Sequence, residues 1–158
     1  MNNMKKIHLL FVCLGNICRS PMAEFVMRDL IAKAQLSDKI STASCGTSGW
    51  HDGEDMHTGT KRILQEQGID TQGFVSSRLP ENALLQYDYI AVMDDNNLRD
   101  VERRLGRNSQ RIFKLTDFCE DFDFVPDPWY TGNFEECFEI IYLCCENWLS
   151  LIKKENNC

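Results

Sequence analysis

Apolar residues gather along the chain in short runs, separated by polar segments and by stretches with a helical period. Residues 6–12 read Lys-Ile-His-Leu-Leu-Phe-Val, a nearly continuous apolar run that is typical of a strand buried on both faces. Similar runs predict three further strands over residues 40–45, 89–93 and 111–115. These runs predict a sheet of four strands.

Helices are predicted between these strands and after the last one. Ser20-Pro21 marks a helix start, because serine can cap the first turn and proline fits its first position. Further helices are predicted over residues 58–67, which Gly68 ends, and over residues 94–105, which are rich in helix formers and end at Gly106. Apolar residues at steps of three and four predict a long amphipathic helix over about residues 134–154.

The order of these elements predicts the fold class. Strands that alternate with helices, without repeats or linkers, indicate an α/β fold, a three-layer sandwich with a central, mostly parallel four-stranded sheet flanked by helices. Segment 117–130 contains acids, prolines and aromatic residues without a regular period and is predicted to be a loop. A length of 158 residues predicts one domain over residues 1–158.

Composition and charge narrow the class of protein. A net charge of -7 disfavours nucleic acid and anionic membranes as partners. The first apolar run is too short for a signal peptide or a membrane span, so we expect a cytoplasmic protein without membrane insertion. In that reducing compartment the eight cysteines are expected to remain thiols, and the lack of a Cys-x2-Cys pair argues against a structural metal.

The segment between the first strand and the first helix carries the most chemistry, and it reads Cys-Leu-Gly-Asn-Ile-Cys-Arg-Ser over residues 13–20. Backbone N–H groups in such a loop and the helix N-terminus attract an anion, and Arg19 offers a planar fork that matches two phosphate oxygens. Gly15 and Asn16 tolerate the positive φ that a tight loop needs. The same surroundings favour the thiolate of Cys13 over its thiol, which makes Cys13 a candidate nucleophile.

Two interpretations of these residues stay open at this point. A Cys-x5-Arg spacing is weak in a chain with eight cysteines, and Cys13 could equally be a buried structural cysteine. Attack on a phosphate ester also needs an acid for the leaving group. Asp127 is the candidate, because Trp129 and Tyr130 could desolvate it; otherwise it is one of several acids on a solvated loop.

The chain resembles a low-molecular-weight protein tyrosine phosphatase in four segments: residues 12–24, residues 46–50, Met93-Asp94 and Asp127-Pro128. This resemblance implies hydrolysis of phosphotyrosine in proteins through a cysteinyl-phosphate intermediate, without a metal or a cofactor. It implies that Cys13 is the nucleophile, that Arg19 binds phosphate and stabilises the transition state, and that Asp127 is the general acid.

The same resemblance implies supporting roles for the rest of the loop. Ser20 would assist the thiolate, Asn16 would hold the shape of the loop, and Ser44 would be a partner of Asn16. Cys18 is the position at which family members form a reversible disulfide with the nucleophile. The phosphate-binding loop is completed by Leu14, Gly15 and Ile17.

The substrate cleft of the family has aromatic walls, and the matching positions here are Trp50, Trp129 and Tyr130. A deep slot with apolar sides suits a phenyl ring, and phosphoserine is too short to reach its floor. Relatives that act on phosphoarginine carry a threonine where this chain has Ile17, so the resemblance favours an aromatic substrate.

Other function classes share this loop. Thiol-dependent arsenate reductases have the same fold but need further cysteines near residues 80–90, where this chain has none. A phosphoryl carrier or phosphate-binding module, and a redox-regulated binding protein, also remain, and hydrolysis by the isolated protein separates them from a phosphatase. The expected partners are phosphotyrosyl proteins, with a cognate tyrosine kinase as a further candidate, and a monomer is expected.

Overall fold

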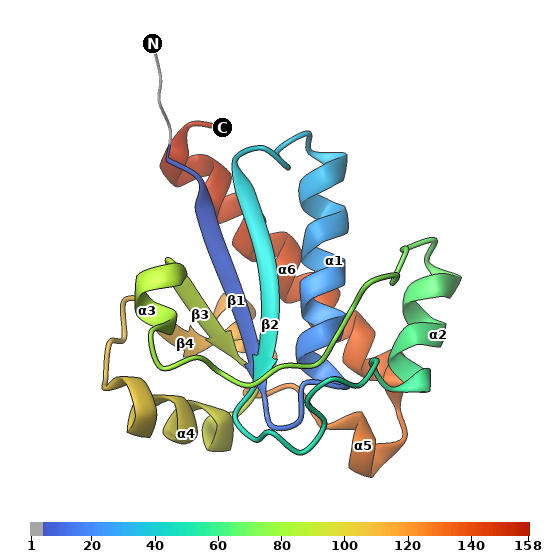
Figure 1. The fold of residues 1–158 in the computed structure, drawn as a ribbon. Helices are drawn as coiled ribbons and strands as arrows, with labels where there is room; N and C mark the ends of the chain where they lie inside the picture. The colour runs from blue at the N-terminus through green and yellow to red at the C-terminus, as the bar shows by residue number, and fades with distance from the viewer. Residues whose placement is uncertain (1–4) are drawn as a thin grey trace.

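The four predicted strands form one parallel sheet in the computed structural model, which describes residues 5–158. The first four residues of the predicted domain 1–158 lie outside this range. Figure 1 shows the elements in chain order: β1 Ile7–Cys13, α1 Arg19–Lys33, β2 Ile40–Gly46, α2 Thr58–Glu66, α3 Ala83–Gln86, β3 Tyr89–Val92, α4 Asp95–Leu105, β4 Ile112–Lys114, the 3-10 turn η1 Leu115–Phe118, α5 Pro128–Thr131 and α6 Phe134–Asn156.

Strand β1 lies inside the sheet, whose order is β2-β1-β3-β4. Phe11 is opposite Ser44 of β2 on one side and opposite Ala91 of β3 on the other. The chain therefore leaves β1 for one neighbour and later returns to its other side. In open parallel sheets a ligand binds beyond the carboxyl ends of the strands at such a reversal of order. The loop after β1 occupies this position.

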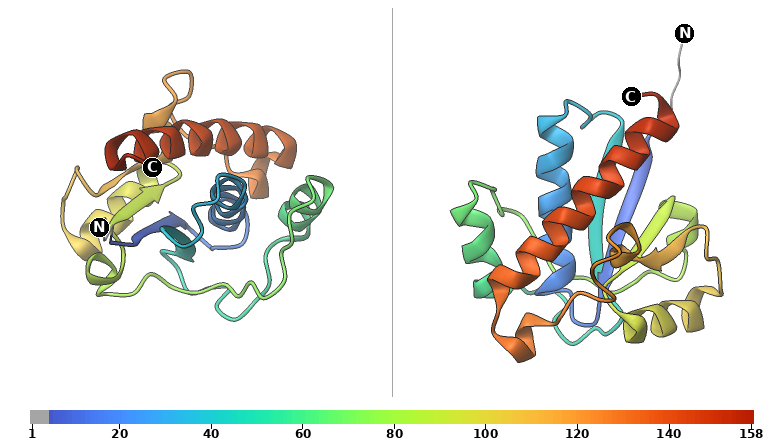
Figure 2. Two further views of the ribbon diagram at one scale, coloured as in Figure 1. Left: turned by 90° about the horizontal axis from the view of Figure 1, so that it is seen from above. Right: turned by 180° about the vertical axis from the view of Figure 1, so that it is seen from behind.

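Both faces of β1 are buried, as the continuous apolar run predicts. Leu9 and Phe11 join a core that α1 and α6 cover, whereas Leu10 and Val12 face a second core that contains Val101 of α4. Figure 2 shows α1 and α6 on the same side of the sheet. The three-layer α/β sandwich with a central four-stranded sheet is therefore confirmed.

Several local predictions were wrong. Segment 117–130 is not all loop, because η1 includes residues 117 and 118 and α5 begins at Pro128 after an N-cap by Asp127. Helix α3 was not predicted, since four residues are too few to show a period. Ser20 does not cap α1; the helix begins at Arg19, and the N-cap residue Cys18 makes no side-chain capping bond.

None of the helices within residues 5–158 is long and apolar enough to cross a membrane.

Candidate active site

The loop of residues 14–18, between β1 and α1, is fixed by the hydrogen bonds that its carbonyl groups accept from neighbouring segments. The carbonyl groups of Cys13 and Leu14 accept from the backbone N–H groups of Thr47 and Ser48, at 2.9 Å each. Three more carbonyl oxygens of the loop accept hydrogen bonds. That of Asn16 accepts from the Ser76 hydroxyl at 2.6 Å, and that of Ile17 accepts from the backbone N–H of His57 at 2.8 Å. That of Cys18 accepts from the Thr60 hydroxyl at 3.1 Å. These carbonyl groups therefore point out of the loop.

The backbone N–H groups of this loop point the opposite way. In a trans peptide unit the N–H is antiparallel to the carbonyl that precedes it, and the described chain has no cis peptide bond. Among the hydrogen bonds of residues 5–158, none has a backbone N–H of residues 14–18 as its donor. Buried backbone N–H groups without a partner are rare. A ring of them at a helix N-terminus forms an anion-binding cradle.

Cys13 lies at the floor of this cradle with its sulfur beside a hydroxyl group. The Cys13 Sγ and Ser20 Oγ atoms are 3.0 Å apart, and both residues are buried. Ser20 Oγ also accepts a hydrogen bond from Asn16 Nδ2 at 2.8 Å. The Ser20 hydroxyl also lies 3.4 Å from the carbonyl oxygen of Cys45, so its hydrogen has two acceptors within reach, that oxygen and the nearer sulfur.

Asn16 carries the positive φ that the loop needs, at 57°. Its side-chain amide also donates to Ser44 Oγ at 3.0 Å, and its Oδ1 accepts from the backbone N–H of Ser77 at 2.9 Å. Ser44 in turn donates to Glu24 Oε1 at 2.6 Å. The expectation of a positive φ was wrong for Gly15, which is not among the residues with positive φ.

The two glycines nearest the loop are explained by close contacts. A Cβ atom added at Gly15 would lie 3.1 Å from Cδ2 of His51, so this glycine lets the histidine ring pack against the loop. A Cβ atom added at Gly46 would lie 2.8 Å from the carbonyl oxygen of Leu14. The end of β2 can therefore support the loop only if residue 46 is glycine.

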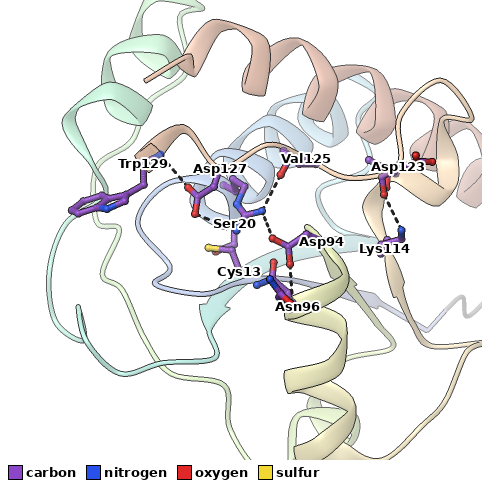
Figure 3. Close-up of polar contacts among 12 residues, drawn as sticks. Cys13, Ser20, Asp94, Asn96, Lys114, Asp123, Val125, Asp127 and Trp129 are labelled. Atoms are coloured by element: carbon purple, nitrogen blue, oxygen red, sulfur yellow. Dashed lines mark hydrogen bonds and ion pairs between the residues drawn. The ribbon is translucent and has the colours of Figure 1, made fainter. Parts of the chain in front are cut away.

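Arg19, the first residue of α1, is held by three acceptors at the mouth of the cradle. Its Nη1 donates to Asp94 Oδ2 at 2.8 Å and to the carbonyl oxygen of Val125 at 2.9 Å, and its Nη2 lies 3.4 Å from Asp127 Oδ2. Figure 3 shows Cys13, Ser20, Asp94, Val125 and Asp127 gathered at this edge of the sheet.

Electrostatics at the site favour the charged form of Arg19. Burial of Arg19 opposes its charge, but the negative charges of Cys13 and Asp127 and the hydrogen bond to Asp94 raise its pKa. At Cys18, burial first and the charge of Cys13 second raise the pKa of the thiol. Cys18 therefore stays protonated at neutral pH.

A cavity opens above the cradle and contains most of the predicted site residues. Cys13, Arg19 and Asp127 meet in this cavity. Its lining also includes the following predicted residues: Leu14, Gly15, Ile17, Cys18, Trp50, Trp129 and Tyr130. Trp50 and Tyr130 are more than 70% exposed and form the rim. Asn16, Ser20 and Ser44 are buried behind the loop.

Two residues near the cavity were not predicted to take part. Asp94 caps α4 through Oδ1, which accepts from the backbone N–H of Asn97, and its Oδ2 orients Arg19. Two signals in the sequence could have indicated this role: its place directly after a predicted strand, and the family resemblance of Met93-Asp94. His51 lines the cavity next to Trp129, at a ring-centroid distance of 6.1 Å. No motif in the sequence points to it.

Asp127 has a different environment from the one expected. Trp129 and Tyr130 do not enclose its carboxyl group, since their exposed fractions are 55% and 78%. Asp127 Oδ1 instead accepts from the backbone N–H of Trp129 at 3.1 Å, and its Oδ2 faces Arg19. Its carboxyl group is thus aimed into the cavity by the start of α5.

Fold and loop together define a class: α/β proteins that hold an anion in a strand-loop-helix cradle with a cysteine at its floor. Comparison with known proteins identifies the family within this class. The family model described as low molecular weight phosphotyrosine protein phosphatase matches residues 8–158. The chain belongs to this family.

Its relatives match over nearly their whole length. The low molecular weight protein-tyrosine-phosphatase YfkJ of Bacillus subtilis is 47% identical over 152 residues, covering 94% of this chain and 97% of YfkJ. The low molecular weight protein-tyrosine-phosphatase PtpA of Staphylococcus epidermidis is 42% identical over 153 residues, covering 96% of this chain and 97% of PtpA. The crystal structure of YfkJ superposes with a TM-score of 0.94, at 45% identity, over 98% of this chain and 99% of that one. The crystal structure of a protein tyrosine phosphatase from Entamoeba histolytica superposes with a TM-score of 0.86, at 34% identity, over 96% of this chain and 99% of that one.

Proposed function

We propose that this chain hydrolyses phosphotyrosine in proteins through a phosphoryl group carried on Cys13. The observation that carries this proposal is the ring of loop N–H groups without a protein acceptor, with the Cys13 sulfur beneath it and Arg19 at its edge. A phosphate dianion satisfies those donors and the guanidinium together. Family membership and the names of the relatives as protein-tyrosine-phosphatases support the same activity.

The first step transfers the phosphoryl group to sulfur. The Cys13 thiolate attacks phosphorus as the bond from phosphorus to the phenolic oxygen breaks, and Asp127 gives its proton to that oxygen. The loop N–H groups and Arg19 bind the three equatorial oxygens in the transition state. Because the contact between Arg19 Nη2 and Asp127 is long, at 3.4 Å, the substrate phosphate can compete with Asp127 for the guanidinium.

The second step restores the enzyme. A water molecule attacks phosphorus while the Asp127 carboxylate takes one of its protons, and the sulfur-phosphorus bond breaks. The electron pair of that bond returns to Cys13 as a thiolate, to which the Ser20 hydroxyl donates across 3.0 Å. Inorganic phosphate leaves. All protons are moved by side chains of this protein, so the reaction needs no metal and no cofactor.

The walls of the cavity favour an aromatic phosphate ester. Ile17 places an aliphatic side chain beside the cradle, and Trp50 and Trp129 present aromatic faces above it. A phenyl ring packs well against such walls. A guanidinium-linked phosphate gains no polar partner from Ile17, and a phosphoserine side chain is too short to span the cavity.

Other aspects of this proposal follow from the site and the chain. Cys18 lines the same cavity as Cys13, and we propose that the two sulfurs form a reversible disulfide under oxidising conditions. In the structure described, the seven cysteines from Cys13 to Cys145 are free thiols. We further propose a single phosphatase domain over residues 1–158, a cytoplasmic monomer, and a cognate tyrosine kinase as a partner.

Hydrolysis of matched phosphopeptides in the presence of a chelator tests the proposed function. Phosphate release should be rapid from phosphotyrosine, slow from phosphoserine and phosphoarginine, and inhibited by vanadate. The variant Cys13→Ser should fold and should release no p-nitrophenol from p-nitrophenyl phosphate above background. Activity that appears only with added divalent metal, or turnover by Cys13→Ser, would contradict the proposal. Turnover of arsenate in place of phosphopeptides would favour the reductase.

A further inference from the structure

A second groove begins where the active-site cavity ends. Leu14 and Trp50 line both, so the two share a wall. Three arginine side chains border this second groove: Arg78, Arg103 and Arg104. We call it the basic groove. Arg103 and Arg104 lie in the last turn of α4. Arg78 itself pairs, through an isolated parallel bridge, with Gly46 at the end of β2.

Positive charge in the basic groove stands out because the whole chain carries a net charge of -7. Arg103 is paired with Asp100 at 2.7 Å, and Arg78 lies 3.4 Å from Asp52. For Arg104, no carboxylate of residues 5–158 lies within ion-pair distance. Asp100 is the one acid among the lining residues. The groove therefore keeps an excess of positive charge beside the substrate cavity.

The position of Arg78 is built into the backbone. A Cβ atom added at Gly49 would lie only 2.0 Å from Nη2 of Arg78, so the guanidinium lies directly against the chain next to Trp50. Arg78 and Arg104 also border a further cavity on the same side. Glycine at position 49 thus allows an arginine to lie flat at the rim that a bound peptide has to cross.

We propose that the basic groove binds aspartate or glutamate side chains that flank the phosphotyrosine of the substrate. This inference rests on the proposed function and adds a substrate class to it. Leu14 and Trp50 line both cavities, so a peptide chain that leaves the active site on this side enters the basic groove. An extended chain covers roughly 3.3 to 3.6 Å per residue. Acidic residues within about three positions of the phosphotyrosine therefore reach the groove. Nucleic acid is a poorer occupant, since the rest of the surface repels it.

Phosphopeptides with matched flanks test the proposal. One peptide has neutral flanks, one has glutamates at the three positions before the phosphotyrosine, one has them at the three positions after it, and two have lysines instead. Exposed guanidinium-carboxylate pairs contribute a factor of roughly 1.5 to 5 each, so one glutamate peptide should exceed the neutral peptide in kcat/KM by about 3- to 10-fold. Raising the salt from 50 to 500 mM should remove most of this preference.

Arginine variants locate the effect in the groove. For each variant the glutamate peptide is compared with the neutral peptide, so a general loss of activity or of folded protein cancels. Arg104→Gln should bring the ratio close to one, and Arg104→Glu should make the lysine peptide the better substrate. Arg107→Gln removes the same charge from a side chain that is 90% exposed and lines neither groove nor cavity, and it should keep the wild-type ratio.

Failure of the basic groove and failure of the proposed function give different results in these experiments. Equal rates for the glutamate and neutral peptides, or equal effects of Arg104→Gln and Arg107→Gln, would overturn the basic groove while phosphotyrosine hydrolysis stands. A preference seen only for a second phosphate in place of the glutamates would overturn the carboxylate assignment. If no peptide is hydrolysed, the proposed function fails. Binding of the same peptides to Cys13→Ser, measured by fluorescence anisotropy, then tests the groove alone.

Discussion

Asn16 is the residue on which the shape of the phosphate-binding loop depends most. It is fully buried, holds φ at 57°, and joins the loop to α1, to β2 and to the segment at Ser77. The change Asn16→Ala removes the side-chain bonds and keeps a Cβ atom at positive φ. Asn16→Gly removes the same bonds but relieves the backbone.

The size of the effect follows from these contacts. Three hydrogen bonds are lost, at about 1 kcal/mol each, so both variants should lose roughly 3 kcal/mol of unfolding free energy. Asn16→Ala should lose roughly 1 kcal/mol more of unfolding free energy than Asn16→Gly, because a residue with a Cβ atom is strained in the left-handed region. For a chain of this length about 2 to 4 °C of Tm correspond to 1 kcal/mol. Tm should therefore fall by about 6 to 12 °C in Asn16→Gly and by a few degrees more in Asn16→Ala.

Urea denaturation measures the loss of unfolding free energy, and thermal unfolding measures the fall in Tm. The value of kcat/KM with p-nitrophenyl phosphate measures how far the phosphate-binding loop is disturbed. A drop of at least tenfold is expected in both variants, because the loop N–H groups lose their fixed direction. Equal stability of the alanine and glycine variants would refute the argument from backbone strain. A loss below about 1 kcal/mol in both would refute the argument that this network supports the loop.

Two further predictions concern carboxyl groups. Asp127→Ala should slow hydrolysis of phosphotyrosyl peptide by roughly 10² to 10⁴, with a smaller loss for leaving groups that need no proton; an unchanged peptide rate would remove Asp127 from the mechanism. Burial raises the pKa of Glu24, against the opposing effects of Ser44 and Arg28, so the folded state binds this proton more tightly than the unfolded state. Its contribution to stability is largest below the unfolded pKa and is lost as the pH rises through the folded one. Glu24→Gln, which cannot ionise, should therefore gain stability relative to the wild type as the pH rises above about 4 in urea denaturation; a pH-independent difference would contradict this.

The strands and long helices could be predicted because each is determined by its own apolar pattern. Residues 9–13 of β1 are buried on both faces, and a continuous apolar run predicts that directly. The short elements α3 and α5 have four residues each and depend on tertiary contacts and on capping, which a period does not show. Their absence from the predicted elements has this physical cause.

For the site, residue types were predictable but relative positions were only partly so. Cys13, Arg19 and Ser20 belong to one local segment, so their proximity follows from the chain. Ser20 does not cap the helix, which starts one residue earlier, but its hydroxyl lies against the sulfur, where the family resemblance implied a role for it. Asp94 orients Arg19 from 75 residues away. Such a contact follows from the order of the strands, which the sequence does not reveal.

The central claim is that the Cys13 sulfur captures a phosphoryl group, and trapping that species is its most direct test. Phosphotyrosyl peptide labelled with ³²P is mixed with the protein, the reaction is quenched in acid within milliseconds, and the labelled site is mapped by mass spectrometry. The account predicts one phosphoryl group on Cys13 and none in Cys13→Ser. Label on another residue, or phosphate release by Cys13→Ser without any labelled protein, would contradict it.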